Sequence, residues 1–258
     1  MMTTWIDMHA HLDKLDEGPE AALIQARAAG VRKIITIGTE PADHPIVLAL
    51  SQKYYPEVFC TLGVHPHEGS LYTAEAGRFI EENLSLPTVV AVGEIGVDYY
   101  YVHSCREDQR KAFREQLLIA QKHNMPVEIH TRDAEADTIE ILKEFEGSVT
   151  GLIHCFTGTR WLAEEALKLG YHISISGVVT FKNAEALREI VRIIPLERLH
   201  IETDAPFLSP VPQRGKKNTP AFVLHTAQKV SDIRGISMDE LSQATLANAK
   251  SLFPKLVI

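Results

Sequence analysis

Short apolar segments alternate with helical segments along the whole chain. Eight of the apolar segments are rich in Val, Ile and other strand-forming residues and are bounded by polar or turn-forming residues. This pattern predicts strands at residues 5–9, 33–37, 59–64, 89–94, 126–130, 151–154, 172–176 and 199–204.

Apolar residues recur at helical spacing between these strands. Ala22, Ala26 and Ala29 lie three or four residues apart, and Gly30 ends that segment. The same spacing occurs in REDQRKAFREQLLIAQKHN. We expect helices around residues 22–29 and at residues 106–124, 161–169, 184–194, 222–233 and 238–253.

Eight units in which a helix follows a strand predict eight parallel strands, because each helix returns the chain across the sheet. The simplest closed arrangement is a TIM (β/α)8 barrel, with a doubly wound open sheet as the alternative. A length of 258 residues is ordinary for one barrel, so residues 1–258 are predicted to form a single domain. The longest irregular segment, residues 205–220, is of a length that is often functional.

Composition and charge narrow the functional classes. No run of eighteen apolar residues occurs, and we expect neither a membrane span nor a signal peptide. Three widely spaced cysteines argue against a disulfide framework and favour a cytoplasmic location. The net charge of −8 argues against a broad basic surface for nucleic acid, and no obligate protein partner is evident.

Polar residues gather where the predicted strands end. In IDMHAHLD, Asp7, His9 and His11 occupy alternate positions, so we expect them to share one face of the first strand. The carboxyl ends of barrel strands form the active-site face, and leaving polar groups there buried and unpaired would cost several kcal/mol each. The residues expected to converge are His9, His11, Glu94, His130, His154 and Asp204.

Four imidazoles and two carboxylates are a typical ligand set for divalent metal ions. A catalytic zinc takes about three protein ligands, so six ligands suit two ions about 3.5–4 Å apart. Mg, Mn, Zn and Ni all stay open, although nitrogen ligands disfavour Mg. The predicted ligands are His9, His11 and Asp204 on the first ion, His130 and His154 on the second, and Glu94 bridging both.

Two divalent ions outweigh two carboxylates, which favours an anionic substrate. Arg132 and Arg214 follow the fifth and eighth strands, and we expect them to bind a substrate phosphate. For Lys216 and Lys217, solvated surface charge is an equal alternative. His65, which ends the third strand, is predicted to contact the scissile phosphate. By contrast, His67 is expected in a surface loop and Cys155 in the outer core.

These motifs resemble those of the TatD family of metal-dependent hydrolases, in the amidohydrolase superfamily. The resemblance extends from residue 6 to residue 253. It implies a TIM barrel, the same six metal residues and magnesium-dependent deoxyribonuclease or exonuclease activity. Glu128 departs from the family pattern, which is commonly apolar there, and ATLANA departs in the last helix. The matching stretches are IDMHAHLD, LGVHPH, VGEIGVDYYY, FREQLLIAQKHNMPVEIHTRDA, GLIHCFTG, ETDAPFLSP, RGKKNTP and ATLANAKSLF.

The expected reaction is hydrolysis of DNA by a metal-activated hydroxide. Two metals lower the pKa of a bridging water to about 7, and Asp204 orients the nucleophile and takes its proton. Glu94 is the second catalytic carboxylate, and Glu128 and Glu202 are candidate partners of ligand imidazoles. The alternatives are a D-aminoacyl-tRNA deacylase, a small-molecule ester or amide hydrolase, and a non-catalytic metal-binding scaffold.

Overall fold

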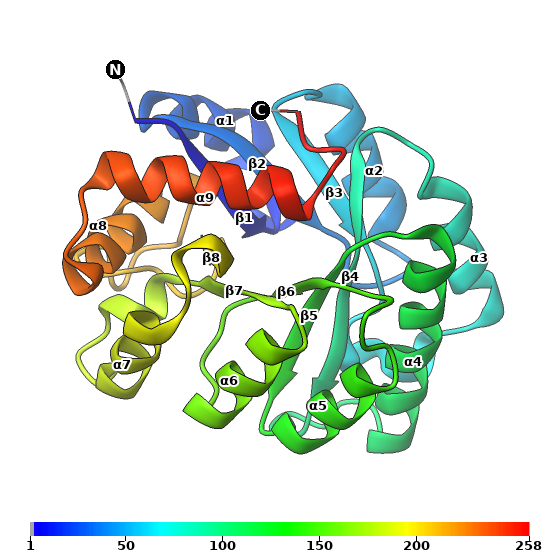
Figure 1. Ribbon diagram of the computed structural model, residues 1–258. Helices are drawn as coiled ribbons and strands as arrows, with labels where there is room; N and C mark the ends of the chain where they lie inside the picture. Colours follow the sequence, from blue (N-terminus) through cyan, green and yellow to red (C-terminus); the bar gives the residue numbers. More distant parts are fainter. Residues whose placement is uncertain (1–2, 258) are drawn as a thin grey trace.

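The computed structural model describes residues 3–257, in which strands and helices alternate around a ring (Figure 1). The strands are β1 (Trp5–Ala10), β2 (Val31–Ile37), β3 (Val58–Leu62), β4 (Val89–Asp98), β5 (Val127–Arg132), β6 (Gly151–Ile153), β7 (His172–Ile175) and β8 (Leu199–Ile201).

Helices follow the strands and surround them. Within residues 3–257, no helix is both long and apolar enough to cross a membrane. The α-helices are α1 (Gly18–Ala28), α2 (His44–Lys53), α3 (Ala74–Asn83), α4 (Arg106–His123), α5 (Glu135–Lys143), α6 (Arg160–Lys168), α7 (Glu185–Ile193), α8 (Val223–Arg234) and α9 (Met238–Leu252). Short 3-10 helices are η1 (Leu12–Lys14), η2 (Pro66–Leu71), η3 (Gly177–Thr180), η4 (Leu196–Arg198) and η5 (Pro220–Phe222).

All neighbouring strands pair in parallel, in the order β1 to β8. The segment after β8 closes the ring against β1, because the Asp204 N–H donates to the His9 carbonyl at 2.9 Å and the His11 N–H donates to the Ala205 carbonyl at 2.7 Å. Since the spatial order follows the sequence around this ring, the predicted TIM barrel is confirmed over the alternative of an open sheet.

Alternate strand side chains form two apolar layers. Outward residues such as Ile129 and Ile201 pack against the surrounding helices. Inside the barrel, Met8 and Phe59 pack in one cluster with Phe253 and with other residues of α9 and the segment after it. Figure 1 shows α9 lying across the ring of strands. The helix therefore closes one end of the barrel and leaves the functional cavity at the other.

The first strand departs from simple alternation. Ile6 and Met8 face the barrel interior, whereas the Asp7 carboxylate accepts from the Thr203 N–H at 2.8 Å and from its hydroxyl at 2.5 Å. The pairing of β1 with β2 is irregular between Asp7 and Ala10. The prediction that Asp7 shares a face with His9 is therefore wrong, because this irregularity changes which side chains point inward.

Candidate metal centre

The six residues predicted as ligands meet at the carboxyl ends of the strands. Most of them line a cavity of about 700 Å³ that opens to solvent, while His9 lies behind its wall and is fully buried. This is the face at which barrel enzymes place their active sites. The predicted ligands in the cavity lining are His11, Glu94, His130, His154 and Asp204.

The first group joins β1 to the segment after β8. The Nε2 atoms of His9 and His11 lie 3.3 Å apart. Asp204 Oδ1 lies 3.6 Å from the first of these nitrogens and 3.5 Å from the second. Three potential ligand atoms therefore surround one point, and the Asp204 side chain is only 13% exposed.

The second group joins β4, β5 and β6. His130 Nδ1 and His154 Nε2 lie 3.4 Å apart, and Glu94 Oε1 lies 3.0 Å from the former and 2.7 Å from the latter. The other carboxylate oxygen, Glu94 Oε2, lies 3.7 Å from His9 Nε2. Glu94 is thus the side chain that reaches both groups.

Two glycines of β4 let the chain approach β5 closely at this point. A Cβ atom on Gly93 would lie 2.6 Å from the Cβ of Glu128, and one on Gly96 would lie 1.9 Å from the His130 carbonyl oxygen. Gly96 also has a φ of +142°, which side chains disfavour. The sequence GEIG therefore places Glu94 against the residues of β5.

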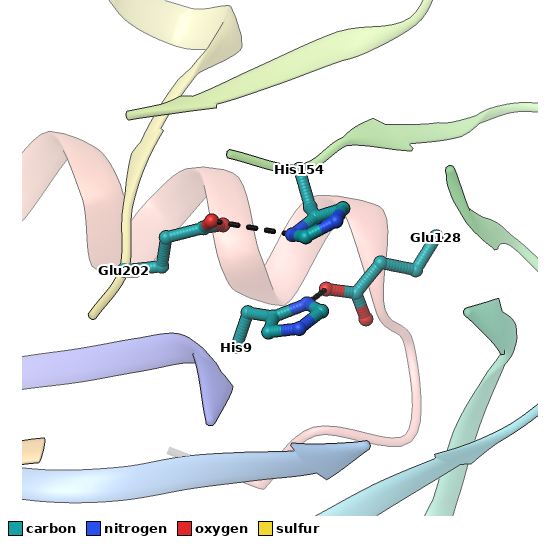
Figure 2. Close-up of side chains that lie close together, drawn as sticks. All are labelled: His9, Glu128, His154 and Glu202. Carbon is teal, nitrogen blue, oxygen red and sulfur yellow. Dashed lines mark hydrogen bonds and ion pairs between the residues drawn. The ribbon is translucent and has the colours of Figure 1, made fainter. Parts of the chain in front are cut away.

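A buried carboxylate lies behind three of the four imidazoles. Figure 2 shows two of these contacts and the parallel rings of His9 and His154, whose centroids are 3.9 Å apart. The hydrogen bonds of His9 and His130 fix the tautomer and direct the lone pair of the other nitrogen towards the cavity, and Glu202 lies at ion-pair distance behind His154. The pairs are His9 Nδ1 with Glu128 Oε1 (2.7 Å), His130 Nε2 with Asp98 Oδ2 (2.9 Å) and His154 Nδ1 with Glu202 Oε1 (3.4 Å).

The donor set fits metal cations. The inner nitrogens of His130 and His154 converge on the Glu94 carboxylate, and a further carboxylate lies behind each of these rings. Acceptors gathered in this way need a positive charge among them. Although burial lowers it, the Glu94 and Glu202 carboxylates raise the pKa of His154 well above its usual range, so a proton occupies this place when no cation does. A metal ion supplies the same charge and accepts several lone pairs at once.

Burial and neighbouring carboxylates also raise the pKa of Glu128 well above its usual range. Burial lowers the pKa of its partner His9, which keeps that imidazole neutral and able to act as a ligand. The neutral His9 ring supplies no positive charge to stabilise an ionised Glu128 carboxylate. A cation bound in the first group would supply that charge.

His65 lies beside the second group but presents a proton. Its Nδ1 accepts from the His67 N–H at 3.1 Å, and burial lowers its pKa to about 4, so the ring is neutral. A neutral ring that accepts at Nδ1 carries its hydrogen on Nε2, which lies 3.3 Å from Glu94 Oε1. In this tautomer His65 donates a hydrogen bond from Nε2, although His65, Glu94 and His130 also lie close enough together to hold a metal ion.

The structure corrects the count of charges. Asp98, Glu128 and Glu202 are fully buried beside imidazoles, in addition to Glu94 and Asp204. These five carboxylates outweigh the four positive charges of two divalent ions, whereas the two counted from the sequence left the site net positive. Attraction of an anionic substrate therefore depends more strongly on cationic side chains at the rim of the cavity.

The basic residues predicted to bind substrate are placed differently from one another. Arg132, at the end of β5, lines the cavity and is exposed. Arg214 does not line it, and its guanidinium lies over the Phe181 ring at 4.1 Å. Neither Lys216 nor Lys217 is part of the lining. Only Arg132 among them is positioned to reach a phosphate at the centre.

Two further residues were misplaced by sequence reasoning. His67 lines the cavity and its Nε2 lies 3.1 Å from Asp98 Oδ2, so it is not a plain surface residue. Cys155 also lines the cavity, with a φ of +41°, and its N–H donates to Glu202 Oε1 at 2.7 Å. Burial raises the pKa of this thiol, which leaves it protonated and unsuited to act as a nucleophile.

Asp98 is the site residue that the sequence analysis missed. The prediction ended the fourth strand at residue 94, but β4 continues to Asp98 and carries this carboxylate to the cavity. The alternation of VGEIGVD contains the signal, because Asp98 lies an even number of residues beyond Glu94.

The contact between His9 and Glu128 leads to a test. We expect Glu128→Leu to weaken metal binding by about 10- to 100-fold, because His9 loses the acceptor that fixes its tautomer. Glu128→Gln keeps an oxygen there and should weaken binding less. Competition against a chromophoric chelator measures both variants, with Glu146→Gln on the exposed surface as control. Metal binding by Glu128→Leu that is as tight as wild type would contradict this role.

Comparisons with known proteins place the chain among related sequences and structures. The family model described as TatD related DNase matches residues 6–254. A Bacillus subtilis (strain 168) protein named as the uncharacterized metal-dependent hydrolase YabD is 38% identical over 253 residues, covering 96% of this chain and 98% of its own. A Citrobacter rodentium protein named 3'-5' ssDNA/RNA exonuclease TatD is 39% identical over 241 residues, covering 91% of each chain.

The fold comparison agrees over the same length. The crystal structure of YjjV, a TatD homologue from Escherichia coli K12, matches with a TM-score of 0.92 at 32% identity. The match covers 98% of this chain and 99% of that one. The whole barrel, and not a fragment of it, is therefore shared.

Proposed function

Because the chain belongs to the TatD-related DNase family, with relatives named as metal-dependent hydrolases, we propose that it is a metal-dependent exonuclease acting on single-stranded DNA. The observation that carries this proposal is the convergence of two groups of imidazole nitrogens on the two oxygens of Glu94. Phosphodiester hydrolysis is the chemistry that a pair of cations at such a centre supports well.

Two divalent ions would be held by the six predicted residues, with Glu94 shared between them. When bound, these ions supply a more acidic water and compensate the negative charge that builds on a phosphodiester during hydrolysis. The first ion would take His9, His11 and Asp204, and the second would take His130 and His154.

Side chains of the cavity supply the remaining functions. Asp204 is the carboxylate of the first group that reaches the open cavity, where it can orient water and accept its proton. His65 presents an N–H that can donate to a phosphate oxygen. Arg132 at the rim offers a planar guanidinium, which suits a second phosphate oxygen or a neighbouring phosphate.

An oligonucleotide assay tests the proposal. A 5′-labelled single-stranded DNA should be shortened stepwise in the presence of Mg²⁺ or Mn²⁺, with loss of activity on chelation and recovery on adding the metal back. We also expect the logarithm of kcat/KM to fall linearly with the logarithm of salt concentration, by about 0.7 for each phosphate contact.

A small neutral ester serves as the comparison substrate, because it makes no phosphate contact and its hydrolysis should be nearly independent of salt. Metal-dependent hydrolysis of a D-aminoacyl-tRNA ester or of the neutral ester, with the oligonucleotide left intact, would overturn the nuclease assignment in favour of the alternative hydrolases.

A further inference from the structure

Two exposed aromatic side chains border the cavity on opposite sides. Tyr101 follows β4 and Phe207 follows β8, and these strands lie four places apart in a ring of eight. Both residues line the cavity, and each is 51% exposed. The candidate metal centre thus lies between two aromatic rings that solvent reaches.

The Tyr101 side is held rigidly to the centre. Asp98 Oδ1 accepts from the N–H groups of Tyr100 and Tyr101, at 2.9 Å each, while its Oδ2 contacts His130. The Arg132 guanidinium lies over both tyrosine rings, 3.8 Å from the first centroid and 4.8 Å from the second. One carboxylate therefore positions a metal-site imidazole and the aromatic turn together.

The Phe207 side is fixed in a similar way. Its N–H donates to the Asp204 carbonyl at 2.8 Å, and its own carbonyl accepts from the Asn218 side chain at 2.6 Å. The ring meets His11 edge to face, with centroids 5.7 Å apart. Phe207 is therefore placed beside the first group of ligands, by a loop whose backbone is tied to that group.

We propose that Tyr101 and Phe207 stack on the two nucleobases that flank the scissile phosphodiester. This inference rests on the proposed nuclease function and specifies its substrate as a strand with unpaired bases on both sides of the bond. Stacking on an aromatic ring contributes about 1–3 kcal/mol per base and is independent of base identity. Bases in a duplex would have to leave their stack first, which disfavours double-stranded substrates.

Substrates that lack one base test the proposal directly. The variants are Tyr101→Ala and Phe207→Ala, assayed on oligonucleotides with an abasic nucleotide on one or the other side of the terminal bond. Each variant should lower kcat/KM on the intact oligonucleotide by about 5- to 150-fold. Removing the base that faces the missing ring should then cause no further loss, whereas removing the other base should.

Ring-preserving variants separate stacking from a structural role. Tyr101→Phe and Phe207→Tyr keep a stacking surface and should restore most of the kcat/KM that the alanine variants lose. Tyr55→Ala, which removes an exposed ring away from the cavity, should retain wild-type kcat/KM. Affinity for a labelled single-stranded DNA, measured by fluorescence anisotropy on metal-free protein, should fall in the alanine variants alone.

The outcomes distinguish this inference from the proposed function. Suppose that wild type degrades oligonucleotides, but that removing either base lowers kcat/KM by the same factor in the alanine variants as in wild type. The ring and the base then act independently, so the stacking inference is overturned and the nuclease function stands. Wild type that hydrolyses methyl p-nitrophenyl phosphate and no oligonucleotide overturns both. If each alanine variant becomes insensitive to removal of one particular base, the result supports both the stacking inference and the nuclease function.

Discussion

Glu94→Gln is expected to abolish hydrolysis and to reduce the metal content of the protein from two ions to one or fewer. Glu94 is only 3% exposed, and its two oxygens approach His154 at 2.7 Å and His9 at 3.7 Å. The amide has the same shape but carries no charge and offers one oxygen in place of two. Several kcal/mol of charge compensation should be lost, which corresponds to a rate at least about 10³-fold lower.

Metal analysis after dialysis and single-turnover hydrolysis of labelled DNA measure the two effects separately. Glu68→Gln is the matched control, because this residue lines the same cavity but belongs to neither ligand group. The control should keep both metal content and rate. A Glu94→Gln protein that retains two ions and wild-type activity would refute the bridging role of this carboxylate.

The barrel and the convergence of the six residues could be predicted because both depend on local pattern. Each predicted strand is a short apolar segment, His130 lies in the last half of β5, and His154 directly follows β6. A parallel ring brings all such ends to one face, whatever the exact bounds of the strands. Helices α2, α3 and α5 were not located by residue, since the sequence analysis did not resolve their patterns.

What the sequence could not provide depends on irregular backbone and on long-range contacts. The irregular pairing of β1 turns Asp7 away from the site, and no local pattern reveals it. The partnership of Asp98 with His130 depends on β4 extending to the rim. Arg214 lies in a loop whose course is set by tertiary contacts, so its distance from the cavity could not be inferred from its position after the eighth strand.

The carboxylates behind the imidazoles change how the centre is understood. A site made only of its six predicted ligands would carry an excess of positive charge with metal bound. Asp98, Glu128 and Glu202 turn that excess into a small net negative charge, because five carboxylates then face the four positive charges of two divalent ions. Asp98 and Glu128 also hold His130 and His9 in one tautomer, and Glu202 lies 3.4 Å from His154 Nδ1. The arrangement therefore favours tight binding of cations over strong electrostatic attraction of an anionic substrate. Recognition of the substrate then depends on side chains at the rim of the cavity, such as Arg132.

The second large effect is expected from replacing Asp204, the carboxylate proposed to accept the proton of the attacking water. Asp204→Asn should lower kcat by about 10²–10⁴-fold, because an amide cannot accept the proton of an attacking water. The fold should survive, since Asp204 has a φ of +58° and Asn is among the residues that tolerate this conformation. The amide oxygen can still coordinate, so metal content should fall less than in Glu94→Gln.

Thermal unfolding, metal analysis and kcat on labelled DNA decide this case. The matched control is Asp133→Asn, an exposed residue with a φ of +51° that lies outside both ligand groups, and its kcat should equal that of wild type. Asp204 lies 3.5–3.6 Å from the Nε2 atoms of His9 and His11, so the metal content of the variant has to be measured together with its activity. If wild type is active and the variant is folded and metal-loaded but inactive, the protein is not a purely metal-binding scaffold. Unchanged kcat in Asp204→Asn would instead mean that another group accepts the proton.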